Sequence, residues 1–177
     1  MHHLILNDAN LTISNTSIIK KSRKFLDFKI KQKDKIYGVN TGFGSFCNVA
    51  VDNKYLEKIQ ENLIKSHSCG MGEEVPVDIV RLILLLKAQS FCLGASGVHL
   101  NTVEALINLY NNNITPVVYQ QGSLGASGDL APLSHLSLSL IGEGNVRFKE
   151  KKYTTKSIFK KLKINPIKLK AKEGLAL

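Results

Sequence analysis

The most informative stretch of this chain is the glycine-dense segment Gly122-Ser123-Leu124-Gly125-Ala126-Ser127-Gly128-Asp129-Leu130-Ala131-Pro132-Leu133. If the Gly128 nitrogen attacks the Ala126 carbonyl and two waters leave, Ser127 becomes the exposed methylidene carbon of a five-membered ring. That ring is 4-methylidene-imidazol-5-one (MIO), which accepts nucleophiles. Glycines permit the tight backbone path, and such strain persists only where surrounding structure holds it.

A competing interpretation is an ordinary glycine-rich turn, which composition alone favours. Gly94-Ala95-Ser96-Gly97 repeats the same four letters, and one of the two copies at most can be reactive. The first copy follows a long apolar run and leads into another helical pattern, which predicts a helix end and its turn. The second copy is followed by Asp129-Leu-Ala-Pro-Leu133, and this context favours it as the reactive one.

Helical periodicities dominate the rest of the chain, so we expect a mainly α fold with a few short strands. The predicted helices cover 54–67, 78–93, 101 to about 112, and 133–141. The apolar residues of 78–93 lie almost all round the helix, which predicts burial on most sides with partners partly beyond Leu177. The predicted strands are 116–119 and a hairpin over 145–155 that turns near 150–151.

Two helix ends carry capping signals. Gly70 stands where a left-handed cap would end the 54–67 helix, which places His67 in its last turn. Asn101 and Glu104 have the spacing of an N-cap and a reaching acid, which predicts a helix start at Asn101.

The net charge of +10 is concentrated at the two ends of the motif-bearing part. Lysines crowd 20–35 and 149–173, whereas 36–148 is slightly acidic. The lysine-rich segments have no RRM-like signature and no zinc-finger spacing, so a solvated face is favoured over nucleic-acid binding.

Cysteine usage and hydropathy favour a cytoplasmic protein. Cys47, Cys69 and Cys92 form no CxxC pair and no metal-ligand spacing with histidines, so we expect reduced thiols and no metal site. The longest apolar run, 82–86, is too short to cross a bilayer, so no membrane association is expected.

Taken together, the motifs resemble the histidine ammonia-lyase family, within the aromatic amino acid lyases and aminomutases that use MIO. The resemblance covers 36–177 and rests on segments 37–44 (YGVNTGFG), 66–70, 94–98, 122–133, 142–144 and 172–177 (KEGLAL). It implies the N-terminal, MIO-bearing part of the helical aromatic amino acid lyase fold.

The resemblance also implies a domain layout. Residues 1–177 would form a single incomplete N-terminal domain: 1–35 a divergent basic flank, 36–148 the active-site motifs, and 149–177 a basic hairpin and helix. Because the family is much longer and Leu177 ends an apolar pattern, we expect a fragment that leads into a missing C-terminal helical bundle. Activity of such a fragment alone is doubtful.

The site residues implied by the resemblance fall into two groups. Ala126, Ser127 and Gly128 would form the MIO, with no external cofactor. Tyr37 would transfer a proton as acid or base, and His67 would place the substrate ring. Without the resemblance, Tyr37 is an ordinary surface tyrosine and His67 a structural residue at a helix end.

Two further residues have supporting roles. Asp129 would orient the loop and help the cyclisation, although an Asp that only starts the next helix is the simpler interpretation. Gly44, with its neighbouring glycines, would keep the loop that carries Tyr37 mobile.

The reaction implied is elimination of ammonia from L-histidine to give trans-urocanate, by an enzyme that is a homotetramer in its full-length form. Asn40 and His67 resemble the histidine branch, although tyrosine ammonia-lyases also carry a His at the second position. A tyrosine or phenylalanine ammonia-lyase or an aminomutase therefore remains the alternative, and a non-catalytic remnant or interaction module is a third.

Overall fold

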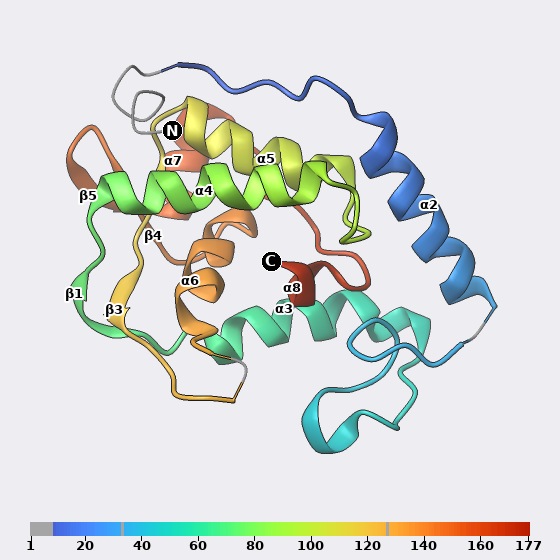
Figure 1. Cartoon of the computed structure of the whole chain (residues 1–177). Coiled ribbons are helices and arrows are strands. Elements are labelled where there is room, and N and C mark those ends of the chain that lie inside the picture. The colour runs from blue at the N-terminus through green and yellow to red at the C-terminus, as the bar shows by residue number, and fades with distance from the viewer. Residues whose placement is uncertain (1–8, 33, 127) are drawn as a thin grey trace.

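The structure is a computed structural model that describes residues 9–32, 34–126 and 128–177 (Figure 1). Ser127, the central residue of the predicted MIO, lies outside the described residues. The predicted mainly α fold class is confirmed. The helices are α2 (Ser17–Lys31), α3 (Leu56–His67), α4 (Val77–Cys92), α5 (Leu100–Asn111), α6 (Ala131–Leu140), α7 (Thr155–Leu162) and α8 (Glu173–Ala176), with single 3-10 turns at Gly44–Phe46 and Asn53–Tyr55.

The core lies where α4 and α5 pack against each other and α6. Figure 1 shows α4 and α5 side by side across the upper part of the molecule, α3 along the lower edge and α6 between them. Leu84 and Phe91 of α4 and Leu106 of α5 are almost completely buried. Burying a side chain of this size contributes about 1.5–3 kcal/mol, so this contact is a main source of stability.

One face of α4 stays open within the described chain. Ile79 and Leu86 are more than 40 % exposed, although both belong to the apolar run. Within the described chain only the face with Val80, Leu84 and Phe91 is buried, so burial on most sides stays a prediction.

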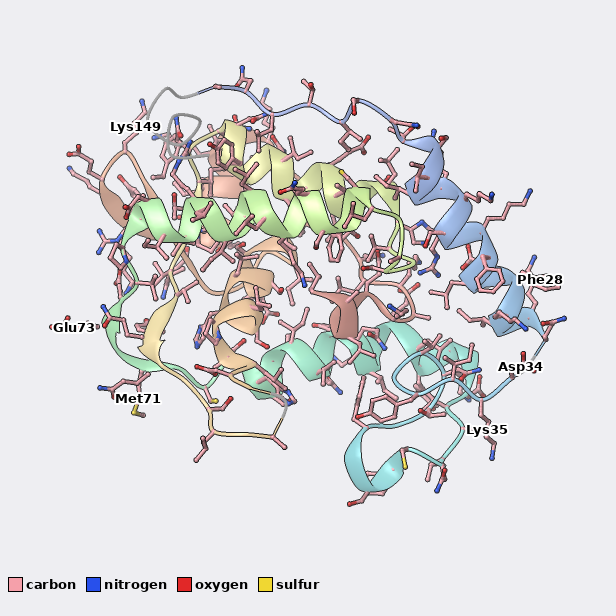
Figure 2. All side chains as sticks on the ribbon, in the orientation of Figure 1. Phe28, Asp34, Lys35, Met71, Glu73 and Lys149 are labelled. Carbon is pink, nitrogen blue, oxygen red and sulfur yellow. The ribbon has the colours of Figure 1, made fainter. Side chains whose placement is uncertain are left out.

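Helix α2 was not predicted, because its many lysines hide a narrow apolar stripe. Ile19 and Leu26 are buried on its inner face, while Phe28 points outward at the edge of the molecule (Figure 2). The buried Arg23 donates to the Gly97 carbonyl at 3.2 Å and the Ala171 carbonyl at 2.9 Å. This arginine therefore joins three distant segments of the chain.

The strands form two small antiparallel sheets. One pairs β1 (Met71–Glu74) with β3 (Tyr119–Gln121), and the other has the order β2 (Thr115–Pro116), β4 (Asn145–Phe148), β5 (Lys151–Thr154). The single strand predicted over 116–119 is wrong, because this segment leaves one sheet and joins the other. The predicted hairpin is confirmed, but Lys149 and Glu150 make the turn, both at positive φ.

The predicted cap at Asn101 is wrong. Helix α5 begins at Leu100, and a residue from another part of the chain caps its N-terminal end. The buried carboxylate of Glu173 accepts the His99 N–H at 2.8 Å and the Thr102 hydroxyl at 2.6 Å. A tertiary acceptor thus replaces the local cap that the sequence pattern indicated.

The left-handed cap predicted at Gly70 is also wrong. Helix α3 ends at His67 as expected, yet Gly70 is absent from the described residues with positive φ. A Cβ on Gly70 would lie 3.1 Å from two ring atoms of His135, so the glycine serves a close approach rather than a turn. Helix α6 begins at Ala131, two residues before the predicted start.

Candidate functional site

Three of the predicted site residues line one cavity of about 390 Å³. Tyr37 and Gly44 come from the glycine-rich loop, and His67 comes from the last turn of α3. The remaining walls are formed by Phe43, Leu63, Lys87, the first turns of α6 (Leu130, Leu133, Ser134) and the end of the chain (Gly174, Leu175, Ala176, Leu177). Residues far apart in the sequence therefore meet at one site beside the start of α6.

The loop that carries Tyr37 is held at one end. Gly38 has φ +68°, and a Cβ there would lie 2.4 Å from a methyl carbon of Leu175, so only glycine fits. The buried Gln60 amide donates to the Gly38 carbonyl at 3.0 Å. Tyr37 itself is 54 % exposed, and its ring meets Phe43 edge to face at 6.0 Å. Its hydroxyl is thus free to contact a ligand.

Gly44 and Asn40 have different surroundings from each other. Gly44 has φ +55°, and no atom lies within 4 Å of the point that a Cβ would occupy, so it allows the loop to turn in open space. The Asn40 side chain accepts the Ile36 N–H at 2.8 Å and donates to the Asp34 carbonyl at 2.7 Å. Asn40 therefore shapes the loop and does not line the cavity.

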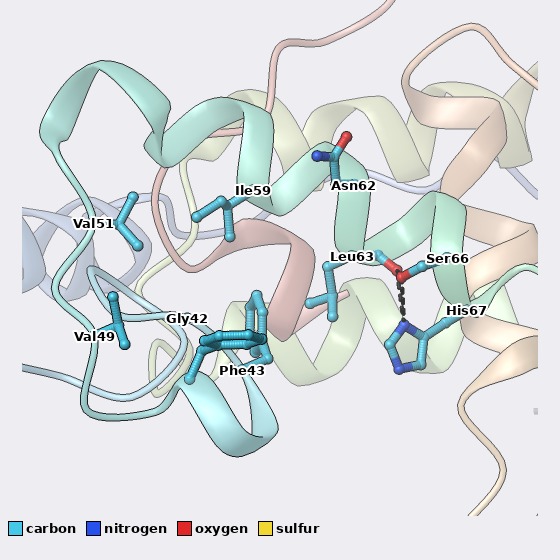
Figure 3. A pocket seen from close by; sticks show the side chains of 10 residues that line it. Gly42, Phe43, Val49, Val51, Ile59, Asn62, Leu63, Ser66 and His67 are labelled. Atoms are coloured by element: carbon cyan, nitrogen blue, oxygen red, sulfur yellow. Dashed lines mark hydrogen bonds between the residues drawn. The ribbon is translucent and has the colours of Figure 1, made fainter.

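His67 presents one ring nitrogen to the cavity. Its Nδ1 lies 2.9 Å from the Leu63 carbonyl and 3.1 Å from Ser66 Oγ (Figure 3). Because a carbonyl can only accept, the proton of the neutral ring sits on Nδ1. Nε2 is then left as an acceptor for an N–H group of a ligand.

A second, mainly apolar cavity of about 470 Å³ also borders His67 (Figure 3). It shares Phe43, Leu63 and His67 with the first cavity, and Val49, Val51 and Ile59 line it as well. His67 therefore lines two spaces that each accommodate a small ligand.

The predicted reactive loop lies at the surface. Every described residue from Gln121 to Leu130 is exposed, and of these only Leu130 lines the cavity with Tyr37. The Gly128 N–H donates to the Gly125 carbonyl at 3.1 Å, which closes a turn around Ala126. Gly128 has φ +95° and no atom within 4 Å of a Cβ position, so the flanks of Ser127 leave room for a cyclised backbone.

Asp129 bonds to both ends of this loop. Its carboxylate accepts the Ser123 N–H at 2.8 Å and the Ala131 N–H at 3.0 Å, and the Ser123 hydroxyl as well. The Ser123 amide is the main cause of the lowered pKa of Asp129. A Cβ on Gly122 would lie 2.0 Å from a carboxylate oxygen, so this glycine is required for the contact.

Sequence reasoning missed Lys87 and Ser134. Lys87 is the one charged side chain among the residues that line the first cavity, and its ammonium lies 5.0 Å from the Phe91 ring centre. Burial, and then repulsion by Lys172, lowers the pKa of Lys87. The available signal was a lysine directly after the apolar run 82–86 of this helix.

Membrane spans and metal clusters are both absent from the residues that the structure describes. No helix among them is both long and apolar enough to cross a membrane. In the same residues, no three His, Cys, Asp or Glu side chains gather closely enough to hold a metal ion.

Comparisons with known proteins agree on one family. A family model described as aromatic amino acid lyase matches residues 4–177. A histidine ammonia-lyase from Staphylococcus saprophyticus is 48% identical over 159 residues, which are 90% of this chain and 32% of that protein. The chain spans about a third of the length of the curated relatives it matches.

Solved structures with different activities share this fold. The crystal structure of histidine ammonia-lyase from Trypanosoma cruzi has a TM-score of 0.89 at 35% identity, covering 99% of this chain and 35% of that one. A tyrosine aminomutase from Streptomyces globisporus has a TM-score of 0.89 at 34% identity, covering 99% of this chain and 33% of that one. The shared fold alone therefore does not select a substrate.

Proposed function

Because the chain belongs to the aromatic amino acid lyase family, we propose that it supplies part of the active site of a histidine ammonia-lyase, which eliminates ammonia from L-histidine to give trans-urocanate. The observation that carries this proposal is the cavity shared by Tyr37, His67 and the first turns of α6. Its volume of about 390 Å³ suits one amino acid.

Elimination needs a group that moves a proton at the β-carbon of the substrate. We assign this role to the Tyr37 hydroxyl, which is exposed on a loop that Gly38 anchors and Gly44 leaves free to turn. A phenol acts as a base near neutral pH only beside a cation, and the substrate ammonium can be that cation.

We assign the recognition of the imidazole ring to His67. Its Nδ1 is engaged by the Leu63 carbonyl, so its Nε2 faces the ligand as an acceptor. The N–H of a neutral imidazole would donate to it, and this pairing favours histidine over an apolar ring that leaves the acceptor unpaired.

The MIO formed from Ala126, Ser127 and Gly128 would supply the electrophile that engages the substrate. The described residues fit such a group: Gly128 adopts positive φ in open space, and Asp129 fixes both sides of the loop. The loop is exposed within the described chain, whereas a strained ring needs surrounding structure. This supports assembly as a homotetramer, in which other parts of the enzyme cover the loop.

We further propose a cytoplasmic location and no role for nucleic acid or membrane partners. Cys47, Cys69 and Cys92 are unpaired thiols, as expected in a reducing compartment. Two alternatives remain: a tyrosine or phenylalanine lyase or an aminomutase, since the fold is as similar to a tyrosine aminomutase as to a histidine ammonia-lyase, and a non-catalytic remnant.

The test joins this chain to the remaining two-thirds of a histidine ammonia-lyase relative and supplies L-histidine, L-tyrosine and L-phenylalanine separately. We expect release of ammonia and urocanate from histidine alone. Preferential turnover of tyrosine or phenylalanine would replace the substrate assignment, and no turnover with a correctly folded chimera would favour the non-catalytic remnant. The same chimera with Ser127→Ala is the control for activity that does not need the loop.

A further inference from the structure

A hydrogen bond between distant residues connects two elements that line the first cavity. The Gly70 N–H donates to Nε2 of His135 at 2.9 Å, across 65 positions of sequence. Gly70 follows His67 by three residues, and His135 stands beside Ser134 on α6. His67 and Ser134 both line the cavity, so this bond links the element that carries one wall to the element that carries the other.

We propose that His135 is a positioning residue, which holds α6 and the loop before it at a fixed distance from His67 through a neutral imidazole. The proposal rests on the proposed function, because it gives His135 its role in that same site. It adds a residue that does not line the cavity with Tyr37 and His67.

The geometry requires one protonation state. An amide N–H can donate only to an unprotonated Nε2, so the proton of the neutral ring must sit on Nδ1. A protonated imidazole would turn a donor toward the Gly70 donor and break the bond. The link therefore exists only while His135 is neutral.

Tyr119 and Gly70 both contact the His135 ring closely. Tyr119 meets it edge to face at 5.1 Å between ring centres, and Gly70 approaches so closely that a Cβ would lie 3.1 Å from the ring and 3.3 Å from Cβ of Tyr119. The absence of a side chain at position 70 is thus explained by the contact. The fixed ring also prevents Nε2 from turning toward solvent.

The surroundings keep the ring neutral. Burial lowers the pKa of His135 below its ordinary value of 6.5. The titratable groups on the elements packed around it are His67 and Cys69 at the end of α3, Tyr119 on β3, and the Lys152–Glu74 ion pair, whose ammonium lies 5.7 Å from the Tyr119 ring centre. In the part of the chain that the structure describes, no carboxylate bonds to the imidazole to favour its charged form.

The sign of the pH effect follows from this lowered pKa. The unfolded chain binds the proton more readily than the folded one, so stability rises with pH. The contribution of His135 is complete above about 6.5 and is lost as the pH falls from there through the lower pKa of the folded state.

Two substitutions distinguish the effect of the Gly70–His135 hydrogen bond from the effect of packing by the imidazole ring. His135→Gln keeps an acceptor oxygen at about the reach of Nε2 but cannot titrate, and His135→Leu removes the acceptor. His99→Gln is the matched control, because His99 is another half-buried histidine whose pKa burial lowers, and it does not line the cavity.

The first measurement is hydrogen exchange of the Gly70 amide in the purified chain by NMR, corrected for the intrinsic effect of pH. In the unsubstituted chain and the His99→Gln variant, protection of Gly70 should fall about tenfold between pH 7 and a pH below the lowered pKa of His135, with a midpoint below 6.5. His135→Gln should stay protected at both values, and His135→Leu should be unprotected at both. Equal protection in all variants, or an Nε2 that carries the proton at pH 7, would overturn the proposal.

The second measurement separates this proposal from the proposed function, because the exchange experiment needs no turnover. In the histidine-lyase chimera, the acid side of the kcat/KM profile should move to lower pH with His135→Gln and not with His99→Gln. An unchanged profile would show that the bond does not position the site. An inactive chimera with the expected Gly70 exchange would count against the proposed function and leave the hydrogen bond established.

Discussion

The two copies of Gly-Ala-Ser-Gly in this chain have the same sequence and opposite surroundings. The copy at 94–97 follows α4, and its last glycine is buried. The copy at 125–128 precedes α6, and its described residues are all exposed. Four letters therefore do not determine the role of a loop. The groups that contact its backbone do.

The first copy is held by distant parts of the chain. The Gly97 N–H, which would be its attacking nitrogen, donates to Ser22 Oγ at 3.1 Å, and the Gly97 carbonyl accepts from Arg23. The Lys172 ammonium donates to the Ser96 carbonyl at 2.7 Å. These tertiary bonds fix the backbone of the segment and connect it to α2 and to the residue before α8.

The second copy bonds mainly to itself. The Gly128 N–H reaches only as far as the Gly125 carbonyl, and the Asp129 carboxylate binds the two ends of the loop. Its nitrogen therefore bonds inside the loop, to the carbonyl one residue before the Ala126 carbonyl that cyclisation requires, and to no distant part of the described chain. This contrast supports the assignment of the reactive serine to position 127.

The largest expected effect separates the two serines. Ser127→Ala removes the hydroxyl that must be eliminated, so turnover by the histidine-lyase chimera should fall by more than about a thousandfold. Ser96→Ala should retain activity, because only the Ser96 carbonyl makes a tertiary bond. Steady-state assays of both variants decide the matter, and loss of activity in the Ser96 variant alone would reverse the assignment.

The next effect concerns the buried acid beside the first copy. Glu173→Ala leaves the His99 N–H, the Lys170 N–H and the Thr102 hydroxyl without their acceptor. We expect the free energy of unfolding to fall by about 3 kcal/mol, measured by urea denaturation. Glu104→Ala, on the exposed face of α5, is the control and should change little. Equal stability of the two variants would contradict the role of Glu173 as the acceptor at the start of α5, directly after the first copy.

Replacing the last glycine of each copy with alanine should cause smaller losses of stability, which compare the two backbones directly. In Gly97→Ala the new Cβ lies 2.9 Å from a Leu26 methyl at φ +67°, so stability should fall by about 2 kcal/mol. In Gly128→Ala the new Cβ meets no atom, and we expect a loss of about 1 kcal/mol from backbone strain alone. Thermal unfolding of both variants provides the measurement, and a larger loss at position 128 would reverse the comparison.

The smallest expected effect is local to the second copy. Because the pKa of Asp129 is lowered, its bonds to Ser123 and Ala131 persist above the ordinary value of 3.8 and are lost as the pH falls through the folded pKa. In Asp129→Ala the Ser123 and Ala131 amides should exchange about tenfold faster at neutral pH. Unchanged exchange would mean that the carboxylate does not order the loop.

The sequence indicated the elements with strong local signals. The apolar periodicities of α3 and α4 and the hairpin of β4 and β5 were all predicted close to their observed bounds. The failures at Gly70 and Asn101 have one cause. Each carries a local capping signal, but a distant partner determines what happens there: His135, 65 positions from Gly70, and Glu173, 74 positions from His99 at the start of α5.

The site shows the same division. Tyr37 and His67 could be named from their motifs, and the structure brings them to one cavity. Lys87 and the His135 link could not be named, because their importance depends on which helices face each other. The chemistry of Ala126 and Gly128 remains a prediction, supported by an open backbone at positive φ.

The intact mass of the purified chain, measured beside its Ser127→Ala and Ser96→Ala variants, tests the central claim most directly. We predict that the chain and the Ser96→Ala variant each lack the mass of two waters, and that the Ser127→Ala variant does not. A full mass for the unsubstituted chain, or a deficit that disappears with Ser96→Ala, would contradict the assignment of the reactive loop to 126–128.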